Sequence, residues 1–229
     1  LGSPGERILT GRASELAEIP CAGLAVMLVL NPNSVNPFEP VRDEMLMRTK
    51  VPMTKEEVRW VSVARLGVQP GDTVWDVGAG TGAVTFELAR KAMDGAVFAV
   101  ERSTEAVELI AQNRQKLGGF NVHIVPGHAP EVLADLPKPN CVFVGGSGGN
   151  MRKIIETALE KNPEARIAVN AIALETLQET QRLFAEFGLQ QVEITQLSAA
   201  RGKNIGCYTM MTANNPVFIL SGKGDKYGE

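Results

Sequence analysis

The sequence predicts an α/β protein with a mainly parallel sheet that ends in an antiparallel hairpin. Between residues 72 and 188, short continuous apolar runs alternate with segments of helical periodicity, which is typical of parallel strands covered by helices on both faces. Two strand-like runs, 189–200 and 206–220, then follow each other with no helix between them. A glycine-rich turn, DVGAGTG at 76–82, joins the first apolar run to a helix, and open α/β sheets bind ligands at such a turn.

Each element of this pattern has a local signal. TKEE at 54–57 has the spacing of a capping box, so a helix is expected to begin at Thr54. Ser103 and Gly118 are expected to begin and end a later helix as its N-cap and its stop. The predicted strands are TVWDV (73–77), AVFAV (96–100), VHIV (122–125), CVFVGG (141–146) and RIAVNAIA (166–173), and the predicted helices of the sheet region are 83–92, 103–118 and 174–188.

The composition suits one α/β domain with an appendage. The chain has 229 residues, 44% of them hydrophobic and 21% charged, with a formal net charge of −3. This balance gives no global attraction to nucleic acid or to an anionic membrane. We expect residues 1–32 to be a small segment ending in a buried strand over 22–30, residues 33–50 to be a linker that begins rich in proline and asparagine, and residues 51–229 to be the main domain.

Cysteine and histidine usage gives no sign of a metal site. Cys21, Cys141 and Cys207 are odd in number and far apart, and no CxxC or Cys/His spacing is present. Buried free thiols in a reducing cytosol are expected instead. The longest apolar run, 22–30, is too short to span a bilayer, and it lacks the basic flank and cleavage site of a signal peptide. We therefore expect a cytoplasmic protein with no metal and no membrane partner.

The glycine-rich turn predicts a cofactor site. Gly78, Gly80 and Gly82 allow the backbone to approach a ligand, and the following helix offers unpaired N–H groups. The turn also satisfies GxGxx(G/A), the dinucleotide fingerprint. Asp76, however, favours a cofactor that carries positive charge, such as the sulfonium and ammonium groups of S-adenosylmethionine. Glu101 ends the second strand, where an acidic side chain can accept hydrogen bonds from the ribose of either cofactor.

The turn after the third strand adds a further signal. It reads PGHA. Class I S-adenosylmethionine-dependent methyltransferases usually have Gly-Asp-Ala at this position, beside the adenine, so His128 replaces the aspartate. A water-mediated contact with adenine and a plain surface histidine both remain open. Together with Asp76, Glu101 and the terminal hairpin, the glycine turn predicts a class I S-adenosylmethionine-dependent methyltransferase (Rossmann-like) fold with a seven-stranded sheet.

Three stretches resemble the decarboxylating precorrin-6Y methyltransferases of cobalamin biosynthesis: VPMTKEEVR (51–59), VFVGGSGG (142–149) and ARGKNIGCYTMMTANNPVFIL (200–220). The resemblance covers roughly residues 50–222. It implies methylation at carbon 15 and decarboxylation of an acetate side chain of a precorrin or cobalt-precorrin, with S-adenosylmethionine as the cofactor, and it implies a homotetramer. The residues that match the cofactor-binding positions of the family are Thr54, Gly78, Ala79, Gly80, Thr81, Gly82, Glu101 and Ala129.

The first thirty residues extend the resemblance. They are similar to the tail of the partner methyltransferase that is fused upstream in bifunctional members of the family. With Leu as its first residue, the chain is expected to be the C-terminal part of such a two-domain enzyme.

The substrate implied by the resemblance carries many carboxylates, and several groups could bind them. Backbone N–H groups in a strand-to-helix turn form an anion cradle, and basic side chains in the hairpin could clamp other carboxylates. A tight turn and solvated loop charges remain the alternatives. No residue pair demands the role of general base. A conjugated macrocycle would supply its own electron sink for decarboxylation, so no metal is needed for that step. The candidates are Gly145, Gly146, Ser147, Gly148, Gly149, Arg201 and Lys203, with Arg42, Arg48 and Lys50 as a second rim near Thr54.

Other functions stay open at this point. A tRNA adenine methyltransferase would be expected to show an NPP-like tetrapeptide after the fourth strand, where this chain has VGGSGG, and aromatic residues make up only 5% of the chain. A protein methyltransferase, and a cofactor-binding subunit that is inactive without its partner domain, remain possible. The glycine fingerprint is the one feature of the sequence that favours a dehydrogenase. The sequence does not indicate whether the substrate carries cobalt.

Overall fold

The computed structural model describes residues 6–21, 23, 25–30 and 39–225, and the chain divides into two units, 1–34 and 35–229. In the first unit the described residues form one short helix, α1 (Ala13–Leu16), which buries no side chain. The strand predicted over 22–30 is not formed by its described part, 25–30. The side chains of Val26, Met27 and Leu28 are 97%, 84% and 83% exposed. A strand needs neighbours for its backbone groups and its apolar face, and no other described segment of this unit supplies them.

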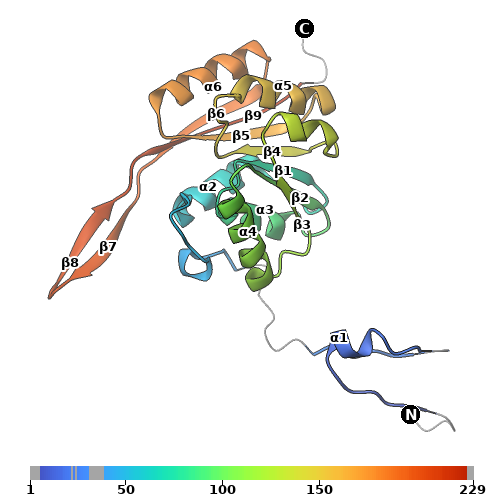
Figure 1. Cartoon of the computed structure of the whole chain (residues 1–229). Coiled ribbons are helices and arrows are strands. Elements are labelled where there is room, and N and C mark those ends of the chain that lie inside the picture. The colour runs from blue at the N-terminus through green and yellow to red at the C-terminus, as the bar shows by residue number, and fades with distance from the viewer. Residues whose placement is uncertain (1–5, 22, 24, 31–38, 226–229) are drawn as a thin grey trace. The chain divides into compact units, whose positions relative to one another are not determined.

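The second unit is built on a seven-stranded sheet covered on both faces by helices (Figure 1). The strand order is β3-β2-β1-β4-β5-β9-β6. The first five strands in this order are parallel, and β9 runs antiparallel to both of its neighbours. This confirms the predicted sheet. The strands are β1 (Thr73–Val77), β2 (Ala96–Glu101), β3 (Val122–Pro126), β4 (Cys141–Val144), β5 (Arg166–Ala171), β6 (Gln190–Leu197) and β9 (Val217–Lys223).

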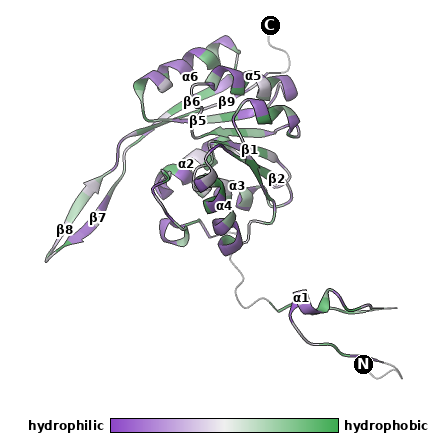
Figure 2. Cartoon of the chain, in the orientation of Figure 1, coloured by the Kyte–Doolittle hydropathy of each residue, from purple (hydrophilic) through white to green (hydrophobic). Residues whose placement is uncertain are grey.

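Successive side chains of the central strands point to opposite faces of the sheet and belong to two separate hydrophobic clusters. Val74 packs with α2 (Glu56–Leu66), α3 (Ala83–Lys91) and α4 (Thr104–Leu117). Trp75, its neighbour in β1, packs with the helices of the other face. Figure 2 shows hydrophobic central strands and helices whose surfaces carry both polar and apolar residues. The helices of the second face are the 3₁₀ helix η2 (Glu131–Asp135), α5 (Met151–Lys161) and α6 (Leu174–Glu186); η2 and α5 were not predicted.

Helix ends test the local signals. Ser103 is the N-cap of α4 and accepts a hydrogen bond from the backbone N–H of Ala106, and Gly118 ends the helix in the left-handed region with φ 73°, so both predictions are confirmed. The capping box at Thr54 is wrong. Helix α2 begins at Glu56 after the N-cap Lys55, which makes no side-chain cap.

The predicted linker 33–50 is only partly within the described residues, and its described part, 39–50, packs onto the rest of the second unit. Val41 and Leu46 are buried, and the 3₁₀ helix η1 (Asp43–Met45) lies between them. The backbone N–H of Val41 donates to Glu87 at 2.8 Å, and that of Met47 donates to the side chain of Asn113 at 2.7 Å. We refer to residues 39–55 as the strap.

The predicted terminal antiparallel hairpin is confirmed, because β6, in the run 189–200, pairs within the main sheet with β9, which begins in the run 206–220. The structure adds a second sheet that was not predicted. Between β6 and β9, β7 (Ala200–Ile205) and β8 (Tyr208–Ala213) form a separate two-stranded sheet that projects from the body (Figure 1). We refer to β7 and β8 as the arm. The two sheets differ in burial, because Ile219 and Leu220 of β9 are in the core whereas most residues of the arm are exposed.

Two further expectations concern cysteines and membranes. All three cysteines are free; Cys141 is buried, and burial raises the pKa of its thiol to about 12. Cys21 and Cys207 are exposed, so the expectation of three buried thiols is wrong for these two. No helix in the described parts of the chain is long and apolar enough to cross a membrane.

Candidate active site

A cavity of about 770 Å³ opens at the carboxyl ends of β1, β2 and β4. This volume falls within the range of roughly 300–1,000 Å³ that is usual for small-molecule sites. The cavity brings together every residue predicted to bind the cofactor except Gly82. Those that line it are Thr54, Asp76, Gly78, Ala79, Gly80, Thr81, Glu101, His128 and Ala129.

The three glycines of the turn are needed by the backbone itself. Gly78, Gly80 and Gly82 all lie in the left-handed region, with φ of 73°, 56° and 76°. A Cβ on Gly78 would lie 2.5 Å from the carbonyl oxygen of Gly146, and one on Gly82 would lie 2.8 Å from the ring of Phe86. Gly82 therefore allows the helix to pack closely, while Gly78 lets the turn after β1 touch the turn after β4.

Asp76 is buried at the end of β1 and keeps one oxygen unpaired. The hydroxyl of Thr85 donates to its Oδ2 at 2.5 Å, whereas Oδ1 has no hydrogen-bond partner among the residues that the structure describes. Burial raises the pKa of Asp76 from 3.8 to about 7. A buried carboxylate with a free oxygen on a cavity wall suits a cationic or hydrogen-bond-donating ligand.

Glu101 ties two turns together at the edge of the cavity. Its Oε2 accepts a hydrogen bond from the backbone N–H of Gly80 at 2.8 Å. Its Oε1 accepts from the backbone N–H groups of Arg102 and Ser103, both at 2.9 Å. Each carboxylate oxygen can accept more than one hydrogen bond, so Glu101 can hold the glycine turn and still accept from a ligand hydroxyl.

The second glycine turn, after β4, forms another part of the cavity wall. Gly145, Gly146, Ser147 and Gly148 line it, whereas Gly149 does not. A smaller hollow of about 270 Å³ shares the first three of these residues and continues beyond the ends of β4 and β5. The turn leads into α5, whose first N–H groups are free for an anion.

Arg201 and Lys203 do not line the cavity. Arg201 lies in a cluster of ion pairs with Glu57 and its neighbours, and Lys203 is exposed on the arm. Of the second rim, Lys50 lines the cavity, whereas Arg42 lies 3.6 Å from Glu56 and Arg48 lies 3.9 Å from Asp43. The positions of these two arginines thus favour ion pairing over substrate contact.

Several polar residues of the cavity were missed by the sequence analysis. Lys55 adds a second cation from the strap, and Arg102 adds one from the turn after β2. Asn170 is the penultimate residue of β5, and its side-chain nitrogen is buried with no partner among the described residues. Asn214 and Asn215 come from the chain between the arm and β9; the NPV stretch near them was the one signal in the sequence. In the part of the chain that is described, no three His, Cys, Asp or Glu side chains group as metal ligands.

The parallel sheet, the glycine turn after β1, the acidic residue at the end of β2 and the antiparallel β9 define a class I S-adenosylmethionine-dependent methyltransferase fold. Within that class, the chain belongs to the precorrin methyltransferase family, because the family model for the precorrin methyltransferase domain matches residues 46–223.

Relatives agree with this assignment. A probable cobalt-precorrin-6B C(15)-methyltransferase (decarboxylating) from Pyrobaculum calidifontis is 42% identical over 184 residues, covering 79% of this chain and 94% of the relative. The crystal structure of a precorrin-6Y C5,15-methyltransferase from Geobacter metallireducens is similar, with a TM-score of 0.76, 34% identity and coverage of 80% of this chain and 96% of that one. The C-terminal domain of a precorrin-6Y C5,15-methyltransferase from Rhodobacter capsulatus has a TM-score of 0.69 and 27% identity, with 82% and 100% coverage.

The tRNA adenine methyltransferases, one of the alternatives considered from the sequence, share the fold alone. A tRNA (m1A58) methyltransferase from Aquifex aeolicus superposes with a TM-score of 0.67 over 82% of this chain, at 16% identity. This likeness shows a common architecture and gives no support for an RNA substrate.

Proposed function

We propose that the chain methylates carbon 15 of a precorrin or cobalt-precorrin with S-adenosylmethionine and removes carbon dioxide from an acetate side chain of the same macrocycle, in cobalamin biosynthesis. One observation carries the proposal: a single cavity joins the glycine turn held by Glu101 to a second glycine turn with cations and amides around it. The first half suits a nucleoside cofactor and the second half suits an acidic ligand. The names of the family and of the relatives support a reaction in which the cofactor is S-adenosylmethionine and the acidic ligand is a precorrin.

The residues fit S-adenosylmethionine, which supplies an electrophilic methyl group when bound. Glu101 has acceptor capacity left for ribose hydroxyls, and the unpaired oxygen of Asp76 suits a donor or a cation. His128 and Ala129 lie on the turn after β3, where the adenine is expected, and Thr54 of the strap lies on the same cavity. These residues bind and orient, and they add no covalent chemistry.

The other half of the cavity is assigned to the macrocycle. The backbone N–H groups of Gly145 and Gly146 already donate to the carbonyl of Val77, so Ser147, Gly148 and the start of α5 are left to offer N–H groups to one carboxylate. Lys50, Lys55 and Arg102 offer charge to others. Catalysis then depends mainly on holding the acceptor carbon in line with the methyl group and excluding water. No described residue is assigned as a general base. When carbon dioxide leaves, the electron pair of the broken C–C bond stays with the side-chain carbon, and the conjugated macrocycle can delocalise it.

The arm is assigned to self-assembly, as a homotetramer by the family resemblance. Ile205, Tyr208, Met210 and Met211 are 51–73% exposed on a two-stranded ribbon that projects from the body. Exposed apolar side chains gathered in this way mark interaction surfaces. Light scattering on the Tyr208→Lys/Met211→Lys double variant should show smaller particles than the parent chain. Unchanged particle mass would refute this assignment.

The first unit is assigned to the tail of an upstream methyltransferase domain. Its apolar residues 25–30 lie uncovered by any described part of the unit, and one solved relative is itself the C-terminal domain of a larger protein. A preceding domain would cover this segment. The test is whether a chain that carries that domain protects 25–30 from proteolysis.

A mass spectrum of the product tests the proposed reaction. The chain is incubated with S-adenosylmethionine and a precorrin-6-type intermediate, with and without cobalt. We expect a product that has gained one methyl group and lost one carbon dioxide. The Arg65→Met variant, whose half-exposed side chain lies in the last turn of α2 outside the cavity, should give the same product. S-adenosylhomocysteine binding with no mass change, even with the upstream domain added, would refute the proposal.

A further inference from the structure

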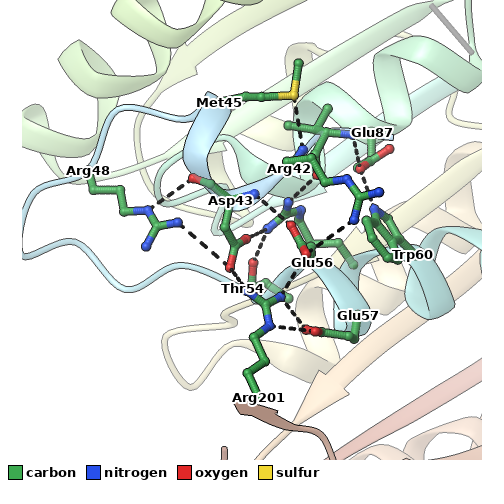
Figure 3. Close-up of polar contacts among 12 residues, drawn as sticks. Arg42, Asp43, Met45, Arg48, Thr54, Glu56, Glu57, Trp60, Glu87 and Arg201 are labelled. Carbon is green, nitrogen blue, oxygen red and sulfur yellow. Dashed lines mark hydrogen bonds and ion pairs between the residues drawn. The ribbon is translucent and has the colours of Figure 1, made fainter. Parts of the chain in front are cut away.

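Arg201 lies at the base of the arm, and its guanidinium is occupied on both edges (Figure 3). Its Nε and Nη2 donate to the two carboxylate oxygens of Glu57, each at 2.6 Å. The guanidinium also lies 3.2 Å from a carboxylate oxygen of Asp43 and 3.2 Å from one of Glu56. Hydrogen bonding with Glu57 raises the pKa of Arg201 and lowers that of Glu57. A planar fork held in this way fixes direction as well as distance.

The carboxylates that hold Arg201 are connected to the cavity wall. Asp43 also accepts a hydrogen bond from the fully buried Arg59, at 2.6 Å. The same nitrogen of Arg59 donates to the main-chain carbonyl of Thr54 at 2.7 Å. Thr54 lines the cavity with the rest of the strap segment 50–55. Arg201 is therefore joined to the cofactor side of the cavity through Asp43 and Arg59.

The base of the arm supplies another part of the same wall. Asn214 and Asn215 directly follow β8 and line the cavity. The backbone N–H of Asn214 donates to the carbonyl of Ala199 at 2.9 Å, two residues before Arg201. The two asparagines thus move with the base of the arm. Strap and arm base, which are far apart in the sequence, meet at the ion cluster around Arg201.

We propose that Arg201 is a positioning residue that fixes the distance between the strap segment 50–55 and the arm base at Asn214 and Asn215, and so the shape of the cavity between them. If the cavity binds the cofactor and the macrocycle, as the proposed function has it, Arg201 sets the position of one relative to the other. It does so without touching either one, because its donors are taken up inside the chain.

Charge balance explains why the loss of Arg201 should be felt at the cavity. Without it, the carboxylates of Asp43, Glu56 and Glu57 would share one close cation, Arg59, since Arg42 and Arg48 lie at 3.6 and 3.9 Å and are about half exposed. Carboxylates that lose a shared cation repel each other. The strap would then separate from the arm base while the rest of the sheet stays in place.

The experiment compares Arg201→Met and Glu57→Gln with a matched control, Arg65→Met. Arg65 forms an ion pair with Glu193 of β6, and its side chain is 43% exposed, against 38% for Arg201, but it lies in the last turn of α2 outside the cavity. Three quantities are measured on the full chain: hydrogen exchange of peptides spanning 50–55 without ligand, the Kd of S-adenosylhomocysteine by calorimetry, and the KM of the macrocycle in the methyl-transfer assay. Glu57 does not line the cavity, so any effect of Glu57→Gln must be transmitted.

We expect both cluster variants to speed exchange at 50–55 and to raise the Kd about tenfold, while Arg65→Met changes neither. Normal exchange and normal Kd in Arg201→Met would overturn the proposal. An increase in the macrocycle KM alone, in Arg201→Met and not in Glu57→Gln, would show a direct carboxylate clamp instead. If the parent chain fails to bind S-adenosylhomocysteine, the proposed function fails, and the exchange data still decide the role of Arg201.

Discussion

Gly78→Ala should be far more disruptive than Gly67→Ala, although both glycines have the same backbone conformation. Gly67 ends α2 with φ 65°, and a Cβ there would meet nothing within 4 Å. Gly78 has φ 73°, and a Cβ there would lie 2.5 Å from the carbonyl oxygen and 2.8 Å from the nitrogen of Gly146. The two substitutions share the backbone penalty and differ in the clash.

The magnitude follows from these two terms. Placing a Cβ in the left-handed region costs about 1–2 kcal/mol, which is the whole expected effect at Gly67. At Gly78 the clash is with backbone atoms that have no rotamer to change, so the turn after β4 must shift. Overpacking of this kind costs roughly 1–3 kcal/mol, and Gly78→Ala should therefore destabilise the chain by about 2–5 kcal/mol in all.

Urea denaturation of both variants measures the difference in the free energy of unfolding, and calorimetry with S-adenosylhomocysteine measures the effect on the cavity. Gly78→Ala should lose affinity, because the two turns that it forces apart both line the cavity. Gly67→Ala should keep it. Equal stability losses in the two variants would refute the reasoning, since they would show that the contact between Gly78 and Gly146 carries no weight.

Three further predictions concern charged groups. Burial raises the pKa of Asp76 to about 7, whereas the same carboxyl in the unfolded chain loses its proton at about pH 4. Its contribution to the free energy of unfolding should therefore fall by about 2–3 kcal/mol between pH 5 and pH 8. Denaturation of Asp76→Asn should lack this fall. Glu101→Ala should weaken S-adenosylhomocysteine binding by about 1–3 kcal/mol in calorimetry, with the exposed Glu108→Ala as a control that binds normally. Arg59→Met should cost about 3–5 kcal/mol in urea, because it strips a buried ion pair, whereas the half-exposed Arg65→Met should cost less than about 1 kcal/mol.

Local signals predicted the elements whose causes are local. Ser103 and Gly118 bound a helix because a cap hydroxyl and a left-handed glycine act within one turn of chain. The alternation of apolar runs and helices predicted parallel strands, with Asp76 and Glu101 near the carboxyl ends of the first two. Their meeting follows from topology, because the carboxyl ends of neighbouring parallel strands share an edge.

Misses arose where distant residues competed for a local group. The TKEE sequence has the right spacing for a capping box, but Glu57 binds Arg201, which lies 144 residues further along the chain. The strap reads as a linker from its composition, yet Glu87 accepts a hydrogen bond from the backbone of Val41, 46 residues away. Nothing near Arg201 in the sequence reveals that three carboxylates surround it.

The arm leaves and rejoins the main sheet at one rung, where Leu197 of β6 pairs with Val217 of β9. Residues 198–216 are therefore a closed excursion that can change length without altering the register of the sheet. Shortening from the tip, beginning with the rungs Ile205–Tyr208 and Asn204–Thr209, removes exposed apolar surface and leaves the rung of Arg201 intact. The length of the arm can thus change independently of the cavity, provided that the deletion stops short of the base.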